Sequence, residues 1–357
     1  MPAQEHVPKN PPNGAGDALG TRPMLFDDGS GYRPEIPAGY EAVFDPEERF
    51  PKAPQTVFFS PVQPANAWGE PSVTYHNGRY YLWFLNWDAA ASLSLATSTD
   101  GIHWREEGYT FLPDKGSRGI GEAEVYRFEP DGPFVNIYCL GSRICFATSE
   151  DLIHWERLGP ERYFTMDERW YKGRWDSLFI LPRAQCGWMA VFNTVPRECR
   201  GLGFATSEDG IEWTAQPPVK VEIPWFEDSG YAGEISAFVK LGDRYFISCD
   251  VWTGLPFGKT SGAGLQRVFV SERPEGPYRP TKRNYIIGAA PGIYEKFHRS
   301  ADGELITQAI VWTFPENNSR RYHVPLFKLV ESDGENRWYR WWTQNAKLKG
   351  DAIQLGE

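Results

Sequence analysis

The chain has 357 residues, a formal net charge of −10 and a hydrophobic share of 41%, which is enough for a sizeable core in one or two domains. The acidic balance argues against a nucleic-acid or anionic-membrane partner, and no apolar run reaches membrane-spanning length. Aromatic residues make up 15% of the chain, and 35 Gly with 29 Pro indicate many turns. We therefore expect short strands rather than long helices.

Residues 1–22 are polar and rich in Pro and Gly, which predicts a flexible lead before a single domain at residues 23–357. The lead lacks the apolar stretch of a secretory signal, a weak indication of a cytoplasmic protein. Five cysteines without a C-x-x-C spacing favour reduced, buried thiols over disulfides or a zinc site. No Gly-rich phosphate loop follows a strand into a helix, so we expect no nucleotide cofactor. His76, His103 and His154 do not form metal-ligand spacing, so we expect no metal.

A nine-residue motif recurs along the chain. It is ATSTDGIHW at residues 96–104, ATSEDLIHW at 147–155 and ATSEDGIEW at 205–213, with a divergent copy, VSERPEGPY, at 270–278. Repeats at this period predict stacked or radial units. The Asp-Gly pair supplies the positive φ of a hairpin turn, so each copy is expected to join the two outer strands of a propeller blade.

The segments between these copies predict the rest of each blade. Residues 55–60 are a candidate closing strand, because an open ring would leave an unpaired edge. The five first hairpins are expected to turn at residues 76–78, 130–132, 185–187, 241–243 and 301–303. The sequence thus predicts one all-β domain, a five-bladed β-propeller with four-stranded antiparallel blades around a central channel.

Carboxylic residues occupy matching places at the start of each blade. Glu70, Glu124, Glu234 and Glu295 each stand eight residues before the turn glycine of their blade, and Asp176 stands three residues further from its own. The first strand of a propeller blade is innermost, so these side chains are expected to converge at one mouth of the channel. Crowded carboxyl groups acquire different pKa values, as general acid and base catalysis of glycoside hydrolysis requires. A channel whose polar residues only hold water or an ion, with no chemistry, is the alternative.

This pattern resembles the family-43 glycoside hydrolases and their relatives in families 32, 62, 68 and 117, which share a five-bladed propeller. The resemblance rests on a blade-one acid followed by Pro-Ser-Val at residues 70–73, a blade-three Asp and a blade-four Glu. It implies that Glu70 is the general base, that Asp176 tunes pKa and orients the sugar, and that Glu234 is the general acid.

The sequence departs from the family at two places. Glu70 stands where the family has Asp, which leaves open whether the enzyme inverts or retains configuration. The blade-five His of the family has no clear match, because Ile293 takes its place and His298 lies further along. A family-like central ion is therefore not expected.

Other residues beside the acids are candidates for substrate binding. Glu124 and Glu295 are candidates for binding hydroxyls, and stacking on a sugar is the candidate role of Trp68, Trp87, Trp175 and Trp252, with core packing as the alternative. Arg174 either pairs with Asp176 or is a solvated loop cation. The turn residues Asp100, Asp151 and Asp209 are expected to be structural.

Hydrolysis of a furanoside or pentoside, in a glycan that contains arabinose, xylose or fructose, is the function that the resemblance implies. Two alternatives stay open. The same fold could pass the sugar to another acceptor as a transglycosidase or phosphorylase. A non-catalytic carbohydrate-binding propeller is the other alternative, and the Glu in place of Asp at position 70 favours it.

Overall fold

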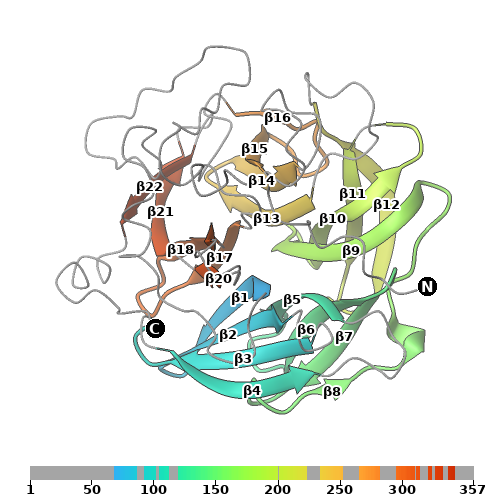
Figure 1. Cartoon of the computed structure of the whole chain (residues 1–357). Helices are drawn as coiled ribbons and strands as arrows, with labels where there is room; N and C mark the ends of the chain where they lie inside the picture. The colour runs from blue at the N-terminus through green and yellow to red at the C-terminus, as the bar shows by residue number, and fades with distance from the viewer. Residues whose placement is uncertain are drawn as a thin grey trace, which may run out of the picture.

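The computed structural model describes residues 68–86, 92–101, 104–111, 120–199, 201–222, 234–251, 265–281, 295–309, 311–313, 321–323, 326–332 and 337–341. These residues form an all-β propeller, in which four-stranded antiparallel sheets stand around a central axis (Figure 1). The predicted lead and the candidate closing strand at residues 55–60 lie outside them. No helix in the described part of the chain is long and apolar enough to cross a membrane.

The strands follow one another outward within each sheet. The first sheet contains β1 (Trp68–His76), β2 (Arg79–Asn86), β3 (Ser92–Ser98) and β4 (Arg105–Phe111). The second contains β5 (Ile120–Arg127), β6 (Phe134–Leu140), β7 (Ile144–Ser149) and β8 (Glu156–Arg157). The third contains β9 (Tyr171–Pro182), β10 (Trp188–Pro196), β11 (Gly201–Ser207) and β12 (Trp213–Lys220).

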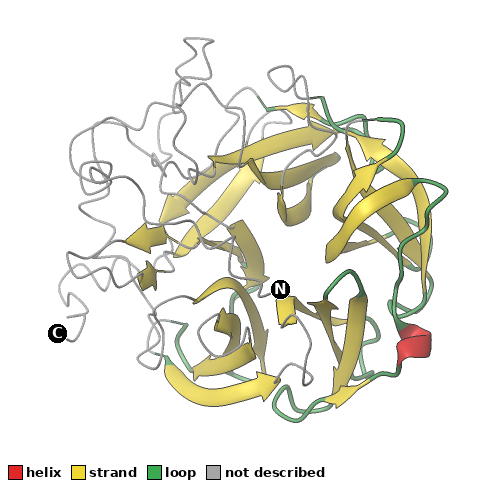
Figure 2. Cartoon of the chain, turned by 45° about the vertical axis from the view of Figure 1, so that its right-hand side comes forward, coloured by secondary structure: helices red, strands yellow, loops and turns green. Residues whose placement is uncertain are grey.

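The later sheets are built in the same way. One contains β13 (Glu234–Leu241), β14 (Arg244–Val251), β15 (Leu265–Ser271) and β16 (Arg279–Pro280). The next contains β17 (Glu295–Arg299), β18 (Leu305–Ala309), β21 (Leu326–Ser332) and β22 (Arg337–Trp341), and β19 (Val311–Thr313) pairs with β20 (Arg321–His323). A short 3₁₀ helix, Pro160–Arg162, is the one helix in the described residues (Figure 2).

The first strand of each sheet lies innermost. Strand β1 contacts β5, β5 contacts β9, β9 contacts β13, β13 contacts β17, and β17 contacts β1. These strands surround the axis in Figure 1. Residues at equivalent positions of different sheets are therefore brought together at the centre.

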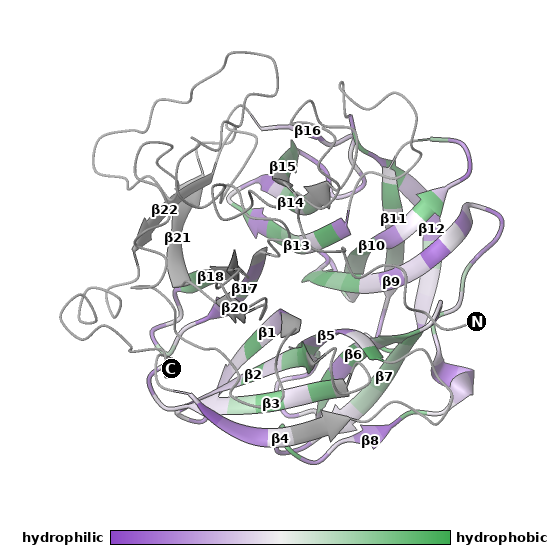
Figure 3. Cartoon of the chain, viewed as in Figure 1, coloured by the Kyte–Doolittle hydropathy of each residue, from purple (hydrophilic) through white to green (hydrophobic). Residues whose placement is uncertain are grey.

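The core lies between neighbouring sheets. One apolar cluster joins residues of the first two sheets, including Trp83 and Tyr138. A second joins the second and third sheets around Trp175 and Phe192, and a third joins the third and fourth around Val191 and Ile247. The outer strands β4 and β8 carry hydrophilic residues (Figure 3), whereas the middle strands β6 and β10 are buried along nearly their whole length, because each sheet packs against neighbours on both faces.

The repeated motif forms the hairpin between the third and fourth strands, as predicted. In the 205–213 copy, the Ser207 hydroxyl accepts the backbone N–H groups of Asp209 and Gly210, and the Asp209 carboxylate accepts two further N–H groups. The indole of Trp213 donates to the Gly210 carbonyl at 2.9 Å. Gly210 has φ +79°, a conformation that suits glycine.

The second and the divergent copies keep parts of this design with other residues. In the second copy, Leu152 takes the glycine position at φ +67° and is fully buried, so its packing offsets the backbone strain. In the divergent copy, the Ser271 hydroxyl still accepts the N–H of Arg273, and Tyr278 donates to a carbonyl in place of Trp. The acids of these turns act locally, which supports their structural assignment.

The cysteines are all free thiols. Cys139, Cys145 and Cys249 are buried as expected, but Cys186 is exposed and Cys199 is half-buried. The prediction that all five are buried is therefore wrong. Cys186 belongs to the first hairpin turn of the third sheet, where a backbone turn at the rim cannot bury its side chains.

Candidate active site

The inner strands are irregular at the ends where the acids lie. The pairing register shifts after Gly69 in β1, after Gly121 in β5 and after Ile235 in β13, and a similar shift interrupts the β9–β10 pairing. Six non-glycine residues with positive φ occur in the described chain, and four of them lie here: Glu70, Glu122, Arg174 and Ser177. Strained residues that a fold holds in place concentrate at functional sites.

Two of the predicted catalytic carboxyl groups share one cation. The Arg174 Nε atom lies 3.1 and 3.0 Å from the two carboxylate oxygens of Asp176, and its Nη2 atom donates to Glu234 Oε1 at 2.6 Å. Arg174 and Asp176 come from β9, and Glu234 comes from the neighbouring β13. The pairing alternative for Arg174 is therefore right, and it extends to a second carboxylate.

Glu70 lies beside this group but has a different environment. Its Oε2 atom accepts the backbone N–H of Glu122 at 2.8 Å. Burial raises the pKa of Glu70 to about 7, the negative charges of Glu234 and Asp176 add to the rise, and Lys296 opposes it. The charges of Glu234 and Asp176 act on Glu70 because the three carboxyl groups lie close together. Three of the five acids that were expected to converge therefore lie near one another.

Asp176 is also tuned by its surroundings. Burial raises its pKa, Arg174 lowers it, and the charge of Glu234 raises it again, with a net rise. Ser177 donates its hydroxyl to Asp176 at 3.2 Å. The buried Asn193 accepts the N–H of Ile235 at 2.8 Å, which ties β10 to β13 next to the acids.

A second group of charges crosses the channel. The Lys296 ammonium lies 2.5 Å from Glu122 Oε1, 2.7 Å from Glu124 Oε1 and 4.3 Å from the centre of the Phe179 ring. Its side chain is only 2% exposed. Ser72 donates to the other Glu124 oxygen at 3.3 Å. Glu124 thus joins the centre as predicted, but as a partner of a lysine.

Sequence reasoning missed Glu122 and Lys296. Counting eight residues back from the turn glycine Gly132 gave Glu124. The turn between β5 and β6, however, is longer than the one between β1 and β2, and β5 contains a bulge. Glu122 therefore also reaches the centre. In β17, strand alternation places Lys296 and His298 on one face, and both are buried. That alternation was the signal that could have found Lys296.

The remaining predicted residues fall into two groups. Trp175 is 1% exposed, packs against Phe164 and Phe192, and donates its indole N–H to the Phe164 carbonyl. It offers no free face to a sugar, so the packing alternative holds. For Trp68 and Glu295 only the backbone, in β1 and β17, is described, and Trp87 and Trp252 lie outside the described residues.

His298 lies two residues beyond Lys296 on β17. Its ring is buried and meets the Tyr80 ring edge-on at 6.1 Å, and its Nδ1 atom has no hydrogen-bond partner among the described residues. Burial lowers the pKa of His298 to about 3. The histidine is therefore neutral at physiological pH and adds no charge to the site.

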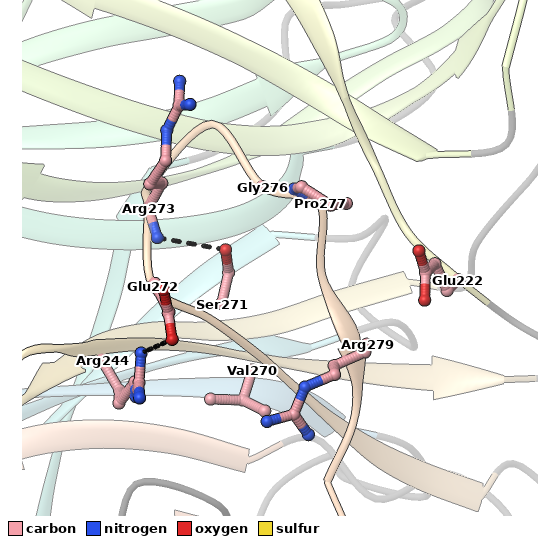
Figure 4. A pocket seen from close by; sticks show the side chains of 9 residues that line it. All are labelled: Glu222, Arg244, Val270, Ser271, Glu272, Arg273, Gly276, Pro277 and Arg279. Atoms are coloured by element: carbon pink, nitrogen blue, oxygen red, sulfur yellow. Dashed lines mark hydrogen bonds and ion pairs between the residues drawn. The ribbon is translucent and has the colours of Figure 1, made fainter.

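A separate cleft of about 280 Å³ lies on the fourth sheet (Figure 4). It is lined by the divergent turn, with Arg273, Arg279 and Arg244, and Arg244 pairs with Glu272 at 2.5 Å. Tyr245 pairs with Ser271 at this end of the sheet, whereas Glu234 pairs with Asp250 at the other. The cleft is thus remote from the carboxylate cluster.

Comparison with solved structures finds the same fold in glycoside-processing enzymes. A thermostable family-43 glycoside hydrolase has a TM-score of 0.57 at 18% identity, over 76% of this chain and 93% of that one. An exo-1,5-α-L-arabinanase from a bovine ruminal metagenomic library has a TM-score of 0.54 at 15% identity, over 76% and 96%. A Bombyx mori family-32 β-fructofuranosidase has a TM-score of 0.61 at 14% identity, over 80% and 64%.

The chain is therefore similar in fold to family-43 and family-32 enzymes, and it spans less than two thirds of the Bombyx mori enzyme. No protein-family model matches its sequence, and no curated protein matches it either. The likeness lies in the arrangement of the sheets, since identities of 14–18% leave most side chains different.

Proposed function

We propose that the chain is a glycoside hydrolase built on a five-bladed propeller at residues 23–357. The proposal rests on one observation: Glu70 lies close to Asp176 and Glu234, whose carboxyl groups share Arg174. Glycoside hydrolysis uses carboxyl groups whose different environments give them different pKa values. The fold likeness to an arabinanase and a fructofuranosidase supports a furanoside or pentoside as substrate.

The proposed reaction uses the three acids in different ways. Glu234 acts in its protonated form: Oε1 keeps the hydrogen bond from Arg174, and Oε2 gives its proton to the departing glycosidic oxygen as the bond from that oxygen to the anomeric carbon breaks. Glu70 removes a proton from the water whose oxygen forms the new bond to that carbon. A base with a pKa near 7 is suited to work at neutral pH, and burial gives Glu70 that value.

Asp176 and Arg174 hold the reacting groups in place. Arg174 fixes the Glu234 carboxyl group relative to Asp176 through contacts of 2.6 to 3.1 Å, and Asp176 is then free to accept a sugar hydroxyl on its exposed side. An arginine fork suits this task because its donors are planar and rigid. Trp68, Trp87, Trp252 and Glu295 remain proposed contacts with the substrate.

The test is a screen of aryl furanosides, aryl pentosides and oligosaccharides of arabinose, xylose and fructose. We expect release of free sugar by the wild type, and a fall in kcat of at least about 1,000-fold for Glu234→Gln and Glu70→Gln. Glu208→Gln is the matched control, since Glu208 is an exposed acid paired with Arg183 on the rim. Full activity in either channel variant would remove that residue from the mechanism.

The products distinguish the alternatives. Following the anomeric protons by NMR shows inversion if water attacks directly, and retention if Glu70 itself attacks the sugar. Addition of phosphate yields a sugar phosphate only if the chain is a phosphorylase. Binding of an oligosaccharide with no turnover in the wild type would contradict hydrolysis and identify a binding propeller.

A further inference from the structure

Lys296 makes a contact that the order of the sheets does not require. Its strand, β17, has β1 and β13 as neighbours in the ring, yet the ammonium reaches Glu122 and Glu124 on β5 and the Phe179 ring on β9. The side chain therefore spans the channel. It brings a positive charge into the carboxylate cluster from β17, whereas Arg174 comes from β9.

The ammonium group is held firmly. Burial alone would lower the pKa of Lys296, but the carboxylates of Glu122 and Glu124 more than offset this and raise it. Lys296 therefore carries its charge across the physiological range of pH. A buried cation with two hydrogen-bonded carboxylates and an aromatic face is a fixed element of a structure.

Glu122 connects Lys296 to Glu70. Glu122 stands in the bulge of β5 at φ +38°, a conformation that a glutamate adopts only when its surroundings hold it. Lys296 binds its side chain, and the backbone N–H of the same residue donates to Glu70 Oε2 at 2.8 Å. The position of that N–H thus depends on the lysine.

We propose that Lys296 is a positioning residue, a built-in cation that holds the Glu70 carboxyl group in place through Glu122 and supplies positive charge to the carboxylate cluster. The proposal rests on the proposed function only for its catalytic consequence. Its physical content, the link from Lys296 to Glu70, is independent of any substrate. Lys296 itself touches no reacting atom.

The charges around Glu70 determine what loss of Lys296 does. Glu234 on β13 and Asp176 on β9 raise the pKa of Glu70, and the Glu122 N–H on β5 and Lys296 on β17 lower it. Arg174 on β9 is occupied with Asp176 and Glu234. Removal of Lys296 eliminates one of the two interactions that lower the pKa of Glu70 and weakens the other, the hydrogen bond from the Glu122 N–H. The pKa of Glu70 should therefore rise above its value of about 7.

The experiment is a pH titration by NMR of protein labelled with ¹³C at the glutamate carboxyl groups. Glu70→Gln assigns the Glu70 signal by its disappearance. In Lys296→Met we expect the Glu70 midpoint to move up by about one pH unit or more, whereas Lys296→Arg stays near the wild type. Arg299→Met, which removes an exposed cation from the same strand, is the control and should change nothing.

A folded Lys296→Met protein with an unmoved Glu70 midpoint would overturn the proposal. If that variant fails to fold because two carboxylates lose their partner, Lys296→Met combined with Glu124→Gln removes the surplus charge and must show the same upward shift. The titration needs no substrate, so failure of the chain to hydrolyse any glycoside would overturn the proposed function and leave the positioning result standing. In an active protein, the pH profile of kcat/KM should shift with the NMR midpoint.

Discussion

The outer turns and the inner strand ends of this propeller satisfy their polar groups in different ways. In the outer turns, the same Ser and Asp positions satisfy the same backbone N–H groups in blade after blade. At the inner strand ends, the charged residues differ from sheet to sheet, except that the first and fourth sheets each present one glutamate: Glu70, then Glu122 with Glu124, then Arg174 with Asp176, then Glu234, then Lys296. The hydrogen bonds of the turns close within nine residues, whereas the inner groups depend on contacts between sheets.

This difference shows where function separates from fold. A turn closed by local hydrogen bonds stabilises its own hairpin and can be copied without reference to its neighbours. A buried carboxylate in the channel needs a partner, because an unpaired charge there is costly, and Glu122, Glu124 and Glu234 find theirs on another sheet. Divergence among otherwise repeated units therefore indicates the site.

Among the variants that compare the channel with the rim, the largest expected effect is on activity, from loss of the shared cation. Arg174→Met leaves Asp176 and Glu234 without their common partner, raises the pKa of Asp176 further, and should lower kcat/KM by about 100-fold or more. Arg183→Met is the matched control, since it breaks an Arg–Glu pair on the rim. Equal losses of kcat/KM in Arg174→Met and Arg183→Met would mean that the channel contributes no more to activity than the rim.

A smaller effect, on stability, should follow a change in an outer turn. A Cβ at Gly210 would lie 2.3 Å from the Phe128 ring at a φ of +79°, so Gly210→Ala should cost about 3 kcal/mol of unfolding free energy. Gly78→Ala meets no atom within 4 Å at φ +77° and should cost only about 1 kcal/mol. Denaturant melts of both variants measure the difference.

Activity should stay near normal in both glycine variants below their melting temperatures. A Gly210→Ala protein that remains folded but loses turnover would show that the outer turn affects activity as well as stability. Equal stabilities for the two variants would instead show that contact with Phe128 contributes nothing.

Much of the fold could be predicted because its signals are local. The repeated turn and the first hairpins fall where the sequence predicts them, since an Asp-Gly or Asn-Gly pair acts within a few residues. The sharing of Arg174 by Asp176 and Glu234 could not be predicted, because it depends on how β9 and β13 meet. Lys296 was missed for the same reason, since its partners are more than 170 residues away.

Trp175 shows the opposite failure. A tryptophan beside a catalytic acid suggests a sugar platform, but strand alternation turns its ring away from Asp176 and into the core between the second and third sheets. The face on which a residue lies depends on bulges that shift the pairing register. The sequence does not reveal where those bulges fall.

The central claim is that Glu70 acts as a base whose pKa its burial in the channel brings to about 7. The most direct test is the pH dependence of kcat/KM for glycoside hydrolysis between about pH 5 and 9. Because Glu70 must be deprotonated and Glu234 protonated in the active form, kcat/KM should follow a bell-shaped profile with one limb at about pH 7, set by Glu70. A profile without a limb near pH 7 would contradict the account.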